Sequence, residues 1–63
     1  MSQTEKIIMH MKRWGSIEPL TALDRYGCFR LAARINEMRS AGFNIVTERV
    51  ERNGKVYARY RLL

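Results

Sequence analysis

The 63-residue chain has few of the residues that form the disulfides or metal sites of small proteins. Its only cysteine, Cys28, cannot form an internal disulfide, and one cysteine with one histidine, His10, falls short of the four ligands of a structural zinc. No apolar run is long enough to span a membrane, and the first residues lack the basic-then-apolar order of a signal peptide. We therefore expect a cytoplasmic protein with no cofactor and no membrane partner.

The length and composition point to one small folded domain. A chain this short buries only about 60% of its unfolded surface, which leaves no room for a second core. The 46% of hydrophobic residues and the single proline are typical of a globular rather than a disordered chain. Residues 1–63 are therefore predicted to form a single domain. The sequence offers no nucleophile–base pair, no paired carboxylates and no phosphate-binding glycine loop, so we do not expect an enzyme.

Acidic residues are also scarce. The chain has 6 Asp and Glu against 12 Lys and Arg, which gives a net charge of +6. Residues 1–24 are neutral overall. Residues 25–39 carry four arginines against one glutamate, and residues 49–61 carry five cations against one glutamate. An excess confined to two segments is typical of a directional surface for a polyanion, and guanidinium groups suit phosphates and base edges.

Local signals predict three helices in the first two thirds of the chain. A capping box over residues 2–5 starts a first helix, which ends at Gly15. Pro19 fits the first turn of a short second helix that ends at Gly27. A third helix is predicted over residues 29–39, with apolar residues on one side and polar residues on the other.

The predicted core comes from apolar residues at helical spacing. Its members are Ile7, Met11, Leu20, Leu23, Leu31, Ile35 and Met38. We also expect Trp14 to be a core aromatic residue and Cys28 a small core residue rather than a reactive thiol. His10 is expected at the edge of the first helix, partly exposed.

After residue 42 the pattern changes to two β-branched and aromatic segments around Asn53-Gly54, the strongest short signal for a hairpin. A type I′ turn there pairs Arg52 with Lys55 and Glu48 with Arg59. The fold class is therefore α+β, with three helices followed by a C-terminal two-stranded hairpin. This is the order of a winged helix-turn-helix.

In that fold the third helix enters the major groove and the hairpin, the wing, lies along the backbone. Arginine can read guanine, asparagine adenine, glutamate cytosine, and alanine can meet a thymine methyl group. The base-reading candidates are Arg30, Ala33, Arg34, Asn36 and Glu37. The phosphate-contact candidates are Arg25, Arg49, Arg52, Lys55, Arg59 and Arg61. Glu37 fits equally as the intrahelical partner of Arg34, and both interpretations stay open.

These motifs resemble a family of short helix-turn-helix proteins encoded by phages and prophages. The resemblance covers nearly the whole chain and is carried by residues 16–20, 26–31, 33–35 and 53–60. It implies a DNA-binding module of phage origin that contains a wing. It also places Arg30 and Arg34 in the motif of the recognition helix.

Two classes of function follow. The leading hypothesis is a small protein that binds double-stranded DNA, as a transcriptional regulator or as an excisionase-like architectural factor. Because one short helix reads only a few base pairs, a homodimer, a cooperative assembly or a partner protein would be needed for specificity. The alternative is a phage-encoded module that docks on a host protein and inhibits or redirects it. Three apolar residues outside the predicted core favour it, namely Met9, Phe29 and Val46.

Overall fold

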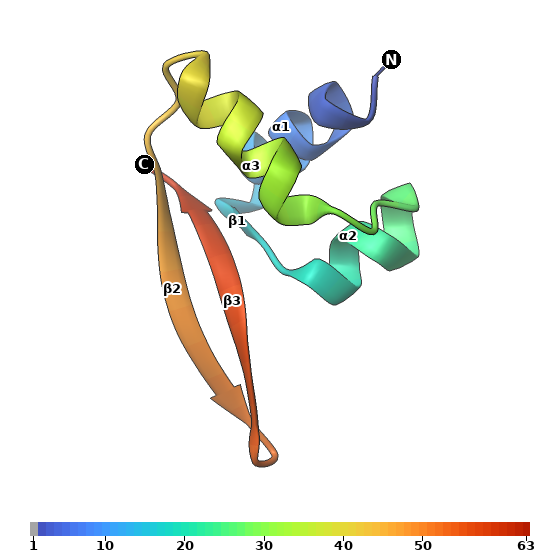
Figure 1. The fold of residues 1–63 in the computed structure, drawn as a ribbon, viewed down its shortest axis with the longest axis vertical. Coiled ribbons are helices and arrows are strands. Elements are labelled where there is room, and N and C mark those ends of the chain that lie inside the picture. Colours follow the sequence, from blue (N-terminus) through green and yellow to red (C-terminus); the bar gives the residue numbers. More distant parts are fainter. Residues whose placement is uncertain (1) are drawn as a thin grey trace.

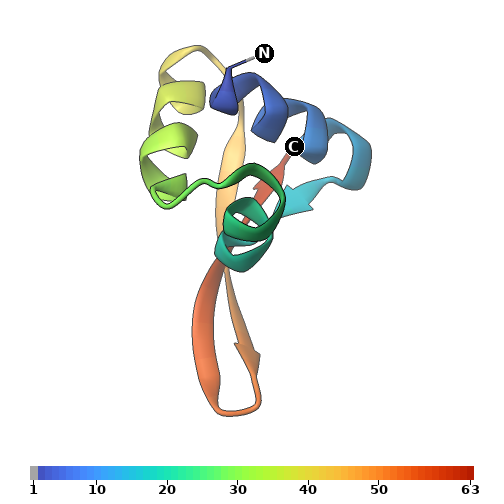
Figure 2. The same ribbon diagram turned by 90° about the vertical axis from the view of Figure 1, so that its right-hand side faces the viewer.

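The computed structural model describes residues 2–63, which form three helices and a three-stranded antiparallel sheet (Figure 1). In chain order the elements are α1 (Gln3–Trp14), β1 (Ser16–Ile17), α2 (Pro19–Tyr26), α3 (Leu31–Ser40), β2 (Ile45–Arg52) and β3 (Lys55–Leu62). The helices pack together at one end, and the β2–β3 hairpin projects beyond them in both views (Figures 1 and 2). No helix within these residues has the length and apolar character needed to cross a bilayer.

The first two helices begin and end where the local signals predict. The Ser2 hydroxyl oxygen accepts a hydrogen bond from the Glu5 backbone N–H at 3.1 Å and caps α1. Gly15 closes α1 in the left-handed conformation, with φ +86°. Helix α2 starts at Pro19 and is closed by Gly27. The boundaries of α1 and α2 are therefore confirmed.

Helix α3 starts two residues later than predicted. The turn after α2 is fixed by hydrogen bonds from the Gly27 N–H to the Leu23 carbonyl and from the Cys28 N–H to the Ala22 carbonyl. Cys28 is then buried, and the backbone of Arg30 is still non-helical, with φ −117° and ψ 60°, so the helix begins at Leu31. Arg30 occupies the N-cap position, and Phe29 lies in the turn.

The hairpin register is confirmed, but the sheet has three strands rather than two. Arg52 pairs with Lys55 and Glu48 with Arg59, as the Asn53-Gly54 turn predicts. The additional strand, β1, pairs Ser16 with Arg61 and Ile17 with Tyr60 on the other side of β3. A two-residue strand between a helix-ending glycine and a proline is too short to show an alternating pattern, and for this reason the sequence did not reveal it.

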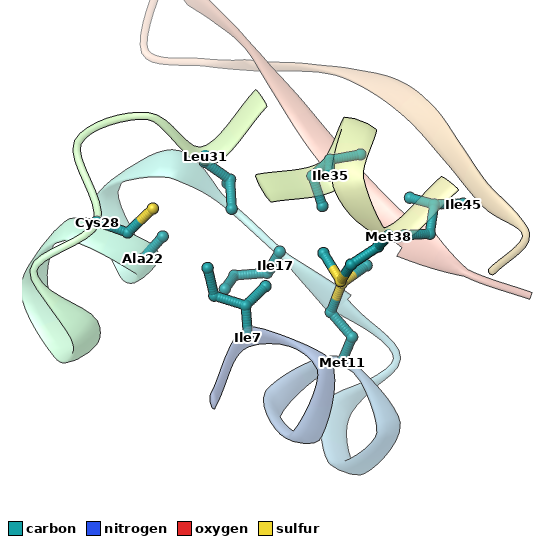
Figure 3. Close-up of a cluster of buried hydrophobic side chains, with 9 residues drawn as sticks. All are labelled: Ile7, Met11, Ile17, Ala22, Cys28, Leu31, Ile35, Met38 and Ile45. Carbon is teal, nitrogen blue, oxygen red and sulfur yellow. The ribbon is translucent and has the colours of Figure 1, made fainter. Parts of the chain in front are cut away.

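The core lies where the three helices meet the base of the sheet (Figure 3). Its buried apolar side chains are Ile7, Met11, Ile17, Ala22, Cys28, Leu31, Ile35, Met38 and Ile45. The core predictions for Ile7 and Met11 of α1, for the three α3 residues and for Cys28 are thus confirmed. Within α3, Leu31, Ile35 and Met38 recur at helical spacing on one side, so the opposite side of that helix faces outward.

Three of the predicted core residues are exposed instead. Leu20 is 77% exposed, Leu23 38% and Trp14 54%. Residues two apart on a helix do not share a face, so Leu20 cannot be buried together with Ala22, and the small Ala22 is the residue that α2 packs into the core. The prediction for His10 was also wrong, because its side chain is buried beside the hydroxyl of Tyr26.

Candidate nucleic-acid interface

The outward side of α3 carries small and polar residues. Ala32, Asn36 and Ser40 are exposed there, and Arg30 is exposed at the N-cap. Short side chains leave the helix backbone accessible to a groove, whereas Arg30 and Asn36 supply donors and acceptors for base edges. Among the described residues, neither Arg30 nor Asn36 forms a side-chain hydrogen bond or an ion pair. Both are therefore available to a ligand.

Two other base-reading candidates are paired with each other. Arg34 Nη1 lies 2.7 Å from Glu37 Oε1 and 2.9 Å from Glu37 Oε2. The Thr4 hydroxyl of α1 donates to Glu37 Oε2 at 3.0 Å. This network lies on the flank of α3 that faces α1, and Ala33 beside it is half-buried. The structure thus shows the intrahelical ion pair that was one of the two interpretations of Glu37.

Arg39 was not among the candidates, and the structure gives it a positioning role. Its Nε and Nη2 atoms donate to the Ile45 carbonyl oxygen at 3.0 and 2.9 Å, and Nη2 also donates to Thr47 Oγ1 at 3.0 Å. These bonds tie the last turn of α3 to the start of β2. The guanidinium of Arg39 therefore links α3 to the hairpin through hydrogen bonds, a role that the sequence pattern alone did not indicate.

Two candidate phosphate contacts on the wing, here β2, β3 and their turn, share one carboxylate. Glu48 Oε1 accepts from Arg59 Nε at 3.0 Å, and Glu48 Oε2 accepts from Arg61 Nε at 3.1 Å. The hydrogen bonds from Arg61 and then Arg59 hold the pKa of Glu48 below its usual value. The register predicted the Arg59 contact, and Arg61 joins because residues two apart on a strand share a face.

The remaining wing cations lie between the middle of the wing and its tip. Arg49, Arg52 and Lys55 are exposed, and none of them forms an ion pair with another described residue. The Arg52 guanidinium lies 5.9 Å from the centre of the Tyr57 ring, and the half-buried Tyr57 donates its hydroxyl to Glu18 at 3.5 Å. Arg49 and the tip therefore present charge to solvent, whereas Arg59 and Arg61 are paired with Glu48.

Arg25, the candidate phosphate contact on α2, lies beside an aromatic ring of α1. Its guanidinium lies 5.5 Å from the ring centre of Trp14, and that of Arg13 lies 4.8 Å from the same ring. His10 packs beside Trp14 at 4.5 Å between ring centres, and its Nδ1 lies 2.8 Å from the Tyr26 hydroxyl oxygen. Burial, and then the charge of Arg25, lower the pKa of His10. The structure thus places Arg25 in an aromatic cluster between α1 and α2.

Sequence reasoning also missed an apolar surface at the start of α3. Phe29 is 86% exposed, and Leu20 and Leu23 of α2 lie beside it along a shallow pocket that also involves Arg30 and Ala32. Because Leu20 and Ala22 are two residues apart on a helix, only one of them can face the core. This spacing could have indicated that Leu20 is exposed. Within residues 2–63, no three His, Cys, Asp or Glu side chains are grouped in a way that could hold a metal ion.

Comparison with known proteins gives one match. A family model described as a winged helix-turn-helix domain matches residues 2–63, which is the whole of the described chain. No curated protein and no solved structure matches significantly. The match agrees with the order of three helices followed by a hairpin, with α3 in the position of the recognition helix.

Proposed function

Because the chain belongs to the winged helix-turn-helix domain family, we propose that it binds double-stranded DNA. In this proposal α3 enters the major groove and the wing lies along the phosphate backbone. The observation that carries it is the distribution of unpaired cations: Arg30 is the N-cap of α3, Arg49 lies midway along β2, and Arg52 and Lys55 flank the turn at the wing tip. Unpaired cations can displace counterions from phosphates without first breaking an internal ion pair.

Helix α3 and the wing have different roles in this proposal. Arg30 and Asn36 project from the exposed side of α3 and are proposed to contact base edges, whereas the wing tip contacts phosphates. Arg34 and Glu37 are proposed to read bases only after their mutual ion pair opens. Arg59 and Arg61 contribute less to binding than the tip, because Glu48 neutralises part of their charge. The proposal assigns no enzymatic activity to the chain.

Specificity requires more than one copy or a partner. Helix α3 has 10 residues, which corresponds to a length of about 15 Å and to a few base pairs of groove. We therefore propose that the protein acts as a homodimer, as a cooperative array or beside a second protein. Its proposed role is that of a transcriptional regulator or an excisionase-like architectural factor of a phage or prophage. That role places it in the cytoplasm of the host cell.

A salt series on a random-sequence duplex tests DNA binding directly. Affinity should fall steeply with salt, because each phosphate contact releases counterions, and the slope of log affinity against log salt reports the number of contacts. Selection of bound sequences from a random DNA pool then gives the preferred site. Two half-sites at a fixed spacing would support a dimer. Absence of binding to any duplex at low salt would contradict the proposal.

The second candidate function is docking on a host or phage protein. Met9 and Trp14 of α1 are each 54% exposed, and two arginines lie beside the Trp14 ring. Methionine, tryptophan and arginine are all enriched in protein interfaces. Met9 lies on α1, whereas the proposed DNA contacts lie on α3 and the wing. Met9→Ala should therefore leave DNA affinity unchanged under the leading proposal. Failure of the parent to bind any duplex, together with a protein partner that the parent binds and Met9→Ala does not, would favour the second function.

A further inference from the structure

Phe29 is the most exposed large apolar side chain of residues 2–63, at 86%. Such exposure is unfavourable in water, so a ring left uncovered is a candidate for contact with a ligand. Leu20 extends the same surface along the shallow pocket beside the start of α3. The nearest cation in sequence is Arg30, which directly follows Phe29 and is exposed as well. An apolar ring and an unpaired guanidinium thus line the same shallow pocket, immediately before the first residue of the proposed recognition helix.

The backbone on both sides of Phe29 is fixed. On one side, the Cys28 side chain is buried, and its N–H donates to the Ala22 carbonyl oxygen at 3.1 Å. On the other side, the Arg30 carbonyl oxygen accepts from the backbone N–H of Ala33 at 3.1 Å and of Arg34 at 3.3 Å. The position of the Phe29 backbone is therefore set by α2 and α3. Docking α3 in a groove would place this residue in a defined position there.

The chemistry of the major groove limits what an apolar ring can contact. Phosphates offer charged oxygen atoms, with which a phenyl ring forms no hydrogen bond or ion pair, and the C–H groups of the sugars are the same at every base and carry no sequence information. The apolar group on the base edges of this groove is the C5 methyl of thymine, and helix-turn-helix proteins present the first residues of the recognition helix to base edges. We propose that Phe29 contacts a thymine methyl group, next to the base or phosphate contacted by Arg30. This inference rests on the proposed DNA-binding function.

The test removes the methyl group from the DNA rather than from the protein. The probe is a fluorescent duplex carrying the selected site, compared with the same duplex in which every thymine is replaced by deoxyuridine. By anisotropy titration, the parent protein should bind the thymine duplex about fourfold more tightly, the factor that corresponds to burying one methyl-sized group. Phe29→Ala should bind both duplexes equally, and its slope against salt should match the parent's, because no phosphate contact is lost.

Matched variants separate this contact from general effects of uracil on the duplex. Phe29→Leu keeps an apolar side chain and should retain part of the preference for thymine. Met9→Ala removes an exposed apolar side chain from α1 and should retain all of it. Because Phe29 and Met9 are exposed, none of these variants removes core packing, and circular dichroism verifies that they fold.

The outcomes distinguish the two proposals. If the parent binds no duplex, DNA binding itself fails. If it binds the thymine and uracil duplexes equally, or if the selected site contains no thymine, DNA binding stands and the role of Phe29 is overturned. A preference for thymine that persists in Phe29→Ala would assign the methyl contact to another residue and would overturn the role of Phe29. The exposed ring of Phe29 would then be a candidate contact for a protein partner.

Discussion

The helical body, residues 3–40, and the wing, residues 45–62, are held together by different forces. Eight of the nine buried apolar side chains belong to the helical body, and the wing contributes only Ile45, at its base. Beyond its base, the wing relies on its backbone ladder, the Asn53-Gly54 turn and the ion pairs of Glu48. Packing therefore fixes the orientation of α3, whereas the wing tip is stabilised locally.

The two regions also differ in the state of their charges. Of the arginines on α3, Arg34 is paired with Glu37, and Arg39 is bonded to the carbonyl oxygen of Ile45. On the wing, Arg49 midway along β2 and Arg52 and Lys55 at the tip have no acidic partner among the described residues. Some of the cations in each region are already engaged within the protein. The positive charge that α3 or the wing can offer to a ligand is therefore smaller than the net charge counted from its sequence. The wing tip offers more of its charge than α3 does.

The largest expected effect tests the contrast in packing. Leu31→Ala removes a buried side chain of α3 and should cost about 2–5 kcal/mol of the free energy of unfolding. Because a core of this size rarely supplies more than about 3–5 kcal/mol, much of the variant should be unfolded. The matched change in the wing is Val56→Ala, whose side chain is 53% exposed and which should cost within about 0.5 kcal/mol. Urea denaturation followed by circular dichroism measures both, and equal costs would remove the contrast.

The next effect concerns base reading by α3. Arg30→Ala should cost about 1–3 kcal/mol of binding free energy on the selected site and much less on a random duplex. Arg34→Ala, predicted from the sequence to behave alike, is the informative comparison, since Arg34 must leave Glu37 before it reaches a base. Competition titrations with both duplexes give the two losses. Equal losses on both duplexes would show that α3 contributes charge and shape rather than sequence reading.

The wing tip should show the opposite behaviour. Arg52→Ala or Lys55→Ala should weaken binding to selected and random duplexes alike, because a phosphate contact carries no sequence information. Each should reduce the slope of log affinity against log salt by about one unit. Arg52→Lys keeps the charge and should keep the slope. If Arg52→Ala instead altered the preferred sequence, the assignment of the tip to phosphates would be contradicted.

Much of this fold could be predicted because its signals are local. The capping box of residues 2–5 and the Asn53-Gly54 turn depend on neighbours in sequence, and both the start of α1 and the hairpin register are confirmed. By contrast, β1 and the buried face of α2 depend on contacts with distant segments. Ile17 is a strand residue only because it pairs with Tyr60. Ala22 is buried only because core side chains from the other elements pack against it.

The candidate site could be predicted less completely, for a related reason. The sequence located the two basic segments, but pairing between side chains decides which cations remain available. Arg34 with Glu37 was one of two open interpretations, and Arg61 was not expected to share Glu48 with Arg59. Phe29 was expected on the third helix and lies instead in the turn before it. The predicted DNA contacts themselves stay predictions.

The helical body and the wing should also respond to acid at different pH. Burial lowers the pKa of His10, so the folded state favours the neutral ring, and the unfolded state binds a proton first as the pH falls. The melting temperature should therefore decrease as the pH falls from about 7 through the ordinary histidine pKa of about 6.5 to the lowered value. His10→Phe should remove this dependence. An NMR titration that placed the pKa of His10 at or above its ordinary value would contradict the prediction.

The smallest effect concerns Glu48 in the middle of the wing. Glu48→Gln removes one negative charge and releases Arg59 and Arg61, so affinity for a random duplex should rise slightly and its salt slope should steepen. The lowered pKa of Glu48 means that its stabilising contribution is present at neutral pH and is lost as the pH falls below the ordinary value, about 4.3, through the lowered one. Any difference in melting temperature between parent and variant should thus vanish in acid. Unchanged or weaker DNA binding by Glu48→Gln would show that Arg59 and Arg61 do not face the duplex, and would confine the phosphate contacts of the wing to its tip.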